Sequence, residues 1–426
     1  LMIAQAWHGM TGMDGRLATI FVFGAAFAPL PALLATRSLQ RQSSAAHESA
    51  LIAGGPWQAI REMLCVARPA TLLGGALTFL LVAGDFAVPD YFGTVGPGFG
   101  VYAAEIFNAW RDWNTNDSPL GGGLSTSAPL ILLTGIVLYF ALRNPLGRGV
   151  QGETGRPPTK LMLGKATIPL TFCAAALGAC LLILPLGRIL WETGAAGPLA
   201  EGDWISRSWT AFSDALQRGR MDILRSIFTG LVAGGFVLVV APALAHLVVS
   251  CRPGRLTRAL LALTALPLLV PGVATGLGAI HAFHRPGWEN FYESPLLPGL
   301  VLGGRFLPIA IFLLAERMMR SPRSIEESGH LAGLSYPVRL YRCCLSSDKA
   351  ALFLAAGIVA VFSFRELDLA VLLPAANASA AVRYYNALHF ARDSFVAAFG
   401  LLIALILFIP VAVSKALSLL SRSSQS

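Results

Sequence analysis

Charged side chains that interrupt long apolar stretches are the residues of this sequence best placed to do chemistry. Asp85 follows one such stretch, and Arg365, Glu366 and Asp368 follow another. A charge in apolar surroundings is costly unless it is paired or faces a water-filled path. We therefore interpret Arg365, Glu366 and Asp368 as a local ion-pair cluster that holds a gate. In the alternative interpretation, the carboxylates are a transient stop for a cation.

The remaining reactive residues predict neither a metal site nor an ATPase site. His281 and His284 could bind a metal on one face of a helix, but two histidines at a membrane rim usually do not. No cysteine pair has metal-ligand spacing. The sequence also lacks a G-x-x-x-x-G-K-[ST] phosphate loop. We expect no resident metal or cofactor and no enzymatic activity of the chain's own.

The composition predicts the elements that position these charges. Hydrophobic residues make up 55% of the chain and charged residues only 13%, which lies outside the usual range of soluble domains. A helix needs about 20 apolar residues to cross a membrane. Nine runs qualify: 17–36, 70–90, 124–142, 166–187, 226–249, 259–280, 296–315, 350–364 extended to about 374, and 396–420. We predict an all-α polytopic membrane protein. Buried helices of a large soluble protein are disfavoured, because the runs recur along the whole chain.

The positive residues predict the orientation of these helices. Lys and Arg are retained on the cytoplasmic side of a membrane. If Glu326 is cytoplasmic, alternation of the nine runs assigns most of the 32 Lys and Arg residues to the same side. The N-terminus is then external and the C-terminus cytoplasmic. Because topology accounts for most of the net charge of +9, we expect no nucleic-acid partner.

Two polar loops repeat each other along the chain. We name residues 47–65 the first elbow and residues 326–344 the second elbow. Four residues of the first match four of the second 279 positions later: Glu48, Ser49, Gly54 and Trp57 match Glu327, Ser328, Gly333 and Tyr336. The flanking apolar runs keep the same offset. We predict two homologous repeats, residues 1–150 with three spans and 151–426 with six, as in transporters built by duplication.

Each elbow reads as a short helix, a break and a second helix. A glutamate near the start favours a helix N-terminus. Gly54 and Gly333 can take the left-handed backbone conformation that ends a helix. Trp57 or Tyr336 then offers an aromatic anchor. The elbows therefore predict knobs that a cytoplasmic partner contacts, with a merely well-capped connector as the alternative.

At these residues the sequence resembles the permease subunits of binding-protein-dependent ABC importers, whose hallmark is a cytoplasmic Glu-Ala-Ala…Gly loop. Residues 266–273, LPLLVPGV, are similar to the Pro-rich start of a span in the fused, two-half permeases for ferric iron and thiamine. Residues 84–89 and 364–367 resemble span ends of the ferric-iron type. The sequence departs from the family where Ser49 and Ser328 replace the first Ala and Gly329 the second. It also departs by lacking the usual Leu-Pro after each loop.

The resemblance implies a mechanism and partners. Each elbow would act as a coupling helix in a groove of one subunit of a cytoplasmic ATPase dimer, and a periplasmic binding protein would deliver the solute. Asp85, Pro267, Pro271 and Gly272, with the charged cluster, would line the gate or the translocation path. The location would be a bacterial inner membrane.

The sequence leaves open which solute is transported and which class of protein the chain is. Ferric iron is the first choice, with thiamine, polyamine and phosphonate as alternatives. A secondary transporter or a membrane-embedded enzyme would be a different class. Because the second repeat has six spans and the first only three, we also expect the first repeat to lack about 110 residues at its N-terminus, as in a truncated chain.

Overall fold

The structure is a computed structural model in which every regular element of the described residues is helical. It describes residues 1–39, 44–111, 125–133, 135–136, 167–195, 202–250, 263–318, 323–345, 349–374, 378–389 and 393–423. Five helices in these ranges are long and apolar enough to cross a membrane, or six if one bent pair forms a single span. The all-helical class is thus confirmed, and several helices are compatible with a membrane protein.

The chain divides into two compact units. Unit 1 contains Leu1–Glu105 and Ala128–Arg188, and unit 2 contains Ile106–Ser127 and Ile189–Ser426. This division follows contacts between residues, whereas the predicted boundary near residue 150 follows the repeat in the sequence. The two divisions describe different properties of the chain.

Unit 1 is built around the pairing of α3 with α4. Its helices are α1 (Met2–Thr11), α2 (Gly15–Phe27), α3 (Pro29–Leu39), α4 (Ser44–Ala83), α5 (Ala87–Val95), the start of α6 (Tyr102–Arg111), α8 (Thr167–Gly178), the π-helix Ala179–Ile183 and the start of α9 (Leu184–Thr193). A Cβ atom at Gly74 of α4 would lie 2.8 Å from Cβ of Pro31. The hydroxyl of Ser38 donates to the carbonyl oxygen of Val66 at 3.1 Å. A small residue thus lets the two backbones approach closely.

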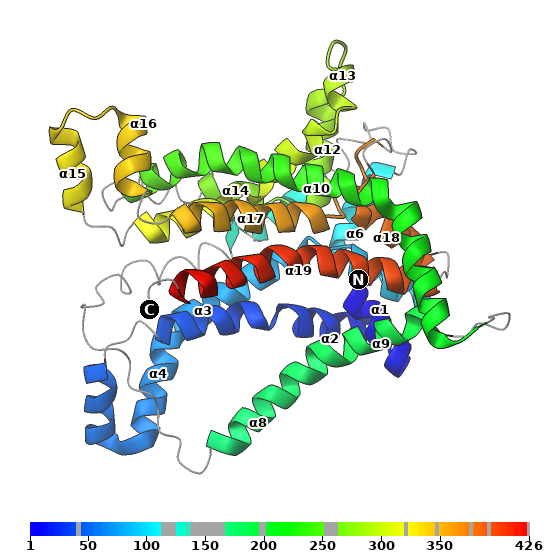
Figure 1. The fold of residues 1–426 in the computed structure, drawn as a ribbon, viewed down its shortest axis with the longest axis horizontal. Coiled ribbons are helices and arrows are strands. Elements are labelled where there is room, and N and C mark those ends of the chain that lie inside the picture. The colour runs from blue at the N-terminus through cyan, green and yellow to red at the C-terminus, as the bar shows by residue number, and fades with distance from the viewer. Residues whose placement is uncertain are drawn as a thin grey trace. The chain divides into compact units, whose positions relative to one another are not determined.

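Unit 2 contains the longest of the described helices and ten further complete helical segments. They are α10 (Trp204–Ser250), a helical segment Leu263–Leu269, α12 (Gly272–Phe283), α13 (Glu289–Tyr292), α14 (Leu296–Met318), α15 (Arg323–Leu331), α16 (Tyr336–Arg339), the π-helix η3 (Leu340–Cys344), α17 (Lys349–Arg365), α18 (Ala380–His389) and α19 (Asp393–Ser423). Its core is formed by α10, α14 and α17, which run side by side in Figure 1.

Glycines explain the close packing of α10 with α14 and α17. Gly230 and Gly234 lie one turn apart on α10, and a Cβ atom on them would lie 2.9 Å from the carbonyl oxygen of Ala360 and 3.1 Å from that of Ala356. Gly299 and Gly303 of α14 face α10 in the same way. Each pair has the small-xxx-small spacing by which membrane helices pack.

The helix bounds correct several predicted spans. The run predicted at 70–90 is a helix from Trp57 to Ala83 that is long and apolar enough to cross a membrane. The run at 259–280 is broken, because segment Leu263–Leu269 and α12 are bent by 103°. The run extended to residue 374 ends with α17 at Arg365, and turns follow. The run at 124–142 lies largely outside the described residues.

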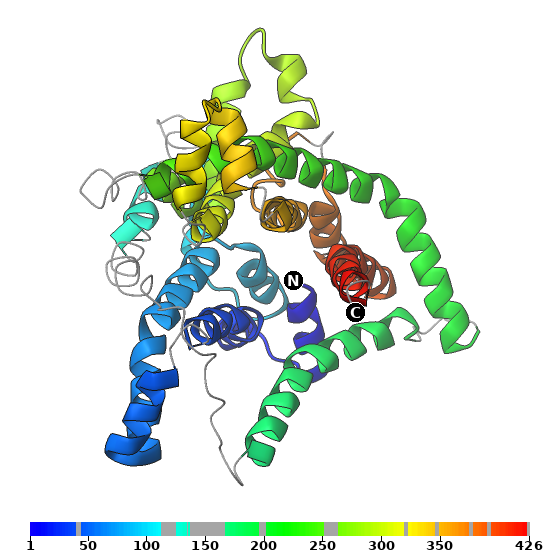
Figure 2. The same ribbon diagram turned by 60° about the vertical axis from the view of Figure 1, so that its left-hand side comes forward.

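α10 is longer than predicted. The sequence indicated a span at 226–249, whereas the helix begins at Trp204 and contains 47 residues. Figure 2 shows it as a long, curved helix. Its first half carries Arg207, Asp214 and Arg218, so a search for apolar runs misses this half although the backbone continues without a break.

Candidate functional site

The break before α12 is set by Pro271. This residue is the N-cap of α12, with an extended ψ of 150°, and its carbonyl oxygen accepts the first N–H bond, from Thr275 at 2.9 Å. Proline has no N–H group to continue a preceding helix. Pro267 lies inside the preceding helical segment Leu263–Leu269. The Pro-rich stretch of the sequence thus produces a sharp bend.

Charged residues meet at this break. A Cβ atom at the buried Gly272 would lie 2.7 Å from Cβ of Asp368 and 2.8 Å from Oε1 of Glu366, and it would overlap Nη1 of Arg305. No residue with a side chain fits there without displacing one of these groups. Three elements therefore converge: the start of α12, the middle of α14 and the segment after α17.

Glu366 forms its ion pair with Arg305. The two side chains are only 10% and 12% exposed, and Asp368 is 8% exposed. The Nε atom of Arg305 is also buried, and it has no hydrogen-bond partner among the described residues. Arg305 was not among the predicted site residues, because nothing near it in the sequence indicates a partner 61 positions away.

Arg365 does not belong to this ion pair, so the predicted pairing of neighbouring residues is wrong. Arg365 is exposed, and its guanidinium lies 5.2 Å from the ring centre of Phe362. The reason is local: α17 ends at Arg365, so Glu366 leaves the helix in a different direction. Asp85 lies in unit 1, where its Oδ1 accepts a hydrogen bond from the N–H of Val88 at 3.2 Å, near the start of α5.

The second elbow contains the predicted left-handed glycine. Gly333 has φ +73° and follows α15. The N–H of Gly333 donates to the carbonyl of His330 at 3.0 Å, and that of Leu334 to the carbonyl of Gly329 at 3.2 Å. This pair of bonds is the Schellman motif that ends a helix. After it, Ser335 is the N-cap of α16.

Gly329 has a packing role in the second elbow. A Cβ atom there would lie 2.7 Å from Sγ of Cys343 and 3.4 Å from Cγ of Arg339. The missing methyl group thus lets α15 approach η3. This contact gives a physical reason why glycine replaces the second alanine of the loop pattern in this elbow.

The first elbow also breaks at glycine, but one residue later than predicted. Gly55 has φ +68°, whereas Gly54 has φ −152°. The prediction that Gly54 is left-handed is therefore wrong, although a Cβ atom at Gly54 would still lie 2.7 Å from Cβ of Gln58. Pro56 follows directly, which favours an extended ψ at Gly55 over a helical one.

Both elbows expose the residues predicted to contact a partner. The exposed residues are Glu48, Ser49 and Trp57 in the first elbow and Glu327, Ser328 and Tyr336 in the second. Large apolar side chains stand beside them: Ile52 and Leu331 are each 88% exposed and Trp57 is 82% exposed. In Figure 1, α15 and α16 project together beyond one end of α10 and α17.

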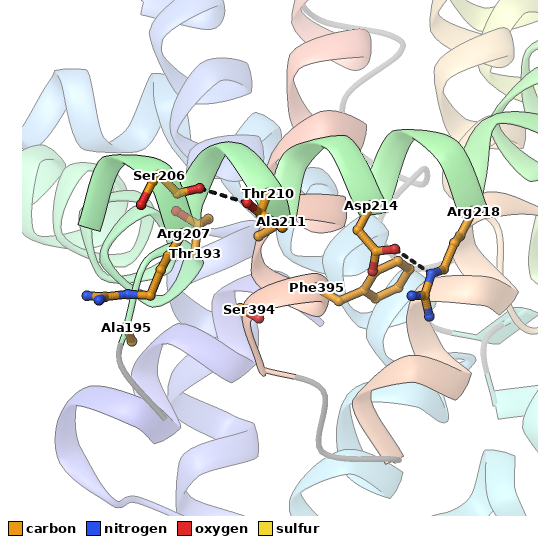
Figure 3. Close-up of a pocket in the computed structure, with 10 residues that line it drawn as sticks. All are labelled: Thr193, Ala195, Ser206, Arg207, Thr210, Ala211, Asp214, Arg218, Ser394 and Phe395. Atoms are coloured by element: carbon orange, nitrogen blue, oxygen red, sulfur yellow. Dashed lines mark hydrogen bonds and ion pairs between the residues drawn. The ribbon is translucent and has the colours of Figure 1, made fainter. Parts of the chain in front are cut away.

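An open pocket of about 520 Å³ lies elsewhere in unit 2, near the start of α10 (Figure 3). Hydroxyl groups, two arginines and the ring of Phe395 line it. The Nε of Arg207 donates to the carbonyl of Gly194 at 2.9 Å, and Arg218 pairs with Asp214 one turn earlier. Both cations are thus engaged within the protein, and the residues that line this pocket include none of the predicted site residues.

No family model matches the chain, and no curated protein matches it. The candidate site is therefore defined by its own geometry: the largely buried ion pair against Gly272, and two exposed elbows that break at a glycine with positive φ.

Proposed function

We propose that this chain is the membrane-spanning permease subunit of an ATP-driven ABC importer with two fused halves. The observation that carries the proposal is the repeated elbow. In both copies a short helix ends at a glycine with positive φ, Gly55 or Gly333, and a second helix follows. Such a rigid knob with exposed apolar side chains suits a groove on a partner protein.

The helix bounds support a duplication at an offset of 278, one residue less than the 279 of the sequence repeat. α6 begins at Tyr102 and α18 at Ala380, 278 positions later, and the break at Gly55 lies 278 positions before Gly333. α2 and α3 together cover the residues that match α14. The nine spans in two repeats, with an incomplete first repeat, are part of this proposal.

The proposed mechanism couples the elbows to a gate. Each elbow would dock on one subunit of a cytoplasmic ATPase dimer, so that ATP-driven closure of the dimer moves the helices attached to it. In the proposed orientation, the ion pair of Arg305 with Glu366 lies towards the external side. Movement of α14 against the segment after α17 would separate this pair and open the path. A periplasmic binding protein would deliver the solute, in a bacterial inner membrane with the C-terminus cytoplasmic.

Ferric iron is the solute we propose, from the resemblance of residues 84–89 and 364–367 to that type. Glu366 and Asp368 beside the break support a cationic solute, because carboxylate oxygens suit hard cations. Thiamine, polyamines and phosphonates are the alternatives. Uptake of radioactive iron by cells that express the transporter, competed by each alternative solute, separates them.

Co-purification tests the proposed class. The full chain, tagged and extracted from its native membrane, should retain an ATPase subunit that mass spectrometry identifies. Leu331→Asp and Trp57→Asp should each lower the retained amount severalfold, because a charge replaces an exposed apolar contact. Trp288→Asp is the matched control, since Trp288 is a half-exposed aromatic outside both elbows. Ion-gradient-driven uptake by the purified chain without any ATPase would instead favour a secondary transporter.

A further inference from the structure

The C-terminal end of α10 contacts the second elbow through one buried histidine. His246 is 9% exposed and lies one turn before the end of α10. Its Nε2 lies 2.9 Å from Oε1 of Glu326 in α15, and its Nδ1 lies 3.3 Å from the hydroxyl oxygen of Tyr336 in α16. One imidazole ring therefore contacts both short helices of the elbow.

One tautomer of the neutral imidazole ring can satisfy both contacts. A carboxylate only accepts hydrogen bonds, so the Nε2 of His246 carries the proton that bonds Glu326. The Nδ1 of the neutral ring then holds a lone pair, which accepts the hydroxyl proton of Tyr336. A single tautomer satisfies both partners. Because the partners lie on different helices, the ring holds α15 and α16 to α10 at the same time.

Arg339 completes this cluster. Its Nε lies 3.6 Å from the same Oε1 of Glu326, and its guanidinium lies 5.9 Å from the ring centre of Tyr336. Arg339 thus balances the charge of Glu326. The rings of His246 and Tyr336 also pack edge to face, with their centres 5.6 Å apart.

A second contact joins the elbow to α10. The hydroxyl of Tyr341 in η3 donates to the carbonyl of Leu238 at 3.4 Å. Leu238 precedes His246 by two helical turns, or about 12 Å along the axis. Attachment at two separated points resists rotation of the elbow about either one.

Neither the neighbouring Glu327 nor the first elbow has the contacts that Glu326 makes with His246. Glu327 is exposed and takes no part in the contacts with His246. In the first elbow, Trp57 and Ile60 stand at the positions of Tyr336 and Arg339. At this offset of 279, the first elbow has neither the hydroxyl nor the guanidinium of the cluster.

We infer that His246 is a positioning residue that makes the second elbow move together with α10. α10 packs along α14, which carries Arg305, so a displacement of the elbow reaches the ion pair at Gly272 through two packed helices. The link between elbow and α10 stands on the contacts themselves. Its consequence for transport rests on the proposed function.

Hydrogen exchange of the full-length protein in detergent micelles, measured by mass spectrometry, tests the link. His246→Leu keeps the bulk of the side chain but not its polar atoms. In this variant the backbone amides of residues 326–339 should exchange about tenfold faster. The reason is that local opening of the elbow no longer has to break a hydrogen bond to a charged group. His246→Gln keeps a donor and an acceptor and should restore slow exchange. Glu326→Gln retains an acceptor without its charge and should give an intermediate rate.

The matched control is Glu327→Gln, the same change one position along, which should leave exchange in the second elbow as in the wild type. Unchanged exchange in His246→Leu overturns the inference. So does equally fast exchange in His246→Leu, His246→Gln and Glu327→Gln, since the effect would then be general loosening. Exchange of residues 47–58 in the first elbow should not change in any variant.

Transport is a separate readout. If an ATPase subunit co-purifies, His246→Leu in the reconstituted complex should lower solute taken up per ATP hydrolysed severalfold, and His246→Gln should recover it. If no ATPase is found, the proposed function fails while the exchange result still decides the role of His246.

Discussion

Arg305 of α14 and Glu366, the first residue after α17, form a buried ion pair against the backbone of Gly272. The pair joins three elements at the break before α12, where the two helical segments are bent by 103°. Removing one partner of such a pair leaves the other charge uncompensated, which is strongly destabilising.

Removing one partner of this pair should cost more than removing both. Arg305→Ala alone should lower the free energy of unfolding by about 3–5 kcal/mol, whereas Arg305→Ala with Glu366→Ala should be closer to the wild type. Arg365→Ala is the control and should cost little, because this neighbouring arginine is exposed. Membrane abundance and thermal unfolding in detergent measure the series. A double variant that is as unstable as Arg305→Ala alone, or less stable, would mean that the pair is not a unit.

Glu366→Gln separates a gate lock from a cation stop. The amide is isosteric with the carboxylate and can still accept a hydrogen bond from Arg305, but it carries no charge. If the pair only locks the gate, the variant should stay abundant and transport at a rate similar to the wild type or faster. A stable variant that no longer transports a cationic solute would favour the stop. Uptake normalised to membrane abundance distinguishes the two results.

The sequence predicted those features that depend on residues close together in the chain: the helices and the turn at Gly333. The helical class followed from the apolar composition, and the left-handed Gly333 followed from a glycine after a short amphipathic helix. The break at Pro271 lies within residues 266–273, the Pro-rich stretch of the sequence. In the first elbow two successive glycines, Gly54 and Gly55, allow either to take the left-handed conformation, and the sequence does not choose between them.

Contacts between residues that are far apart in the chain could not be predicted in this way. Arg305 looks like an isolated charge in an apolar run, and its partner becomes visible only when α14 and α17 pack. The sequence singled out Glu327, yet Glu326 makes the contact with His246, because the rotation of α15 about its axis decides which of two adjacent glutamates faces α10. The polar first half of α10 was missed because apolar length identifies membrane spans and not helices.

The packing of α10 on α17 predicts a sharp difference between two adjacent glycines. Gly234→Leu should destabilise the protein by about 1–3 kcal/mol, because the side chain would enter the space held by the carbonyl of Ala356. Gly235→Leu is the matched control: nothing lies within 4 Å of a Cβ atom there, so it should be tolerated. Thermal unfolding of both variants in detergent measures the difference. Equal stabilities would contradict the close approach of the two helices.

Replacement of an elbow glycine by alanine should lower stability, whereas the same change at a glycine inside a helix should raise it. Gly333→Ala and Gly55→Ala place a Cβ atom in the left-handed region and should each cost about 1–2 kcal/mol of local stability. Gly357→Ala is the control, since Gly357 lies inside α17 with open space around it, and alanine there should add about 0.5–1 kcal/mol of stability.

Gly333→Pro, with φ held near −65°, should prevent the turn altogether. We expect this protein to insert normally and to lose ATPase retention and uptake together. Normal uptake by Gly333→Pro would show that the turn is only a connector.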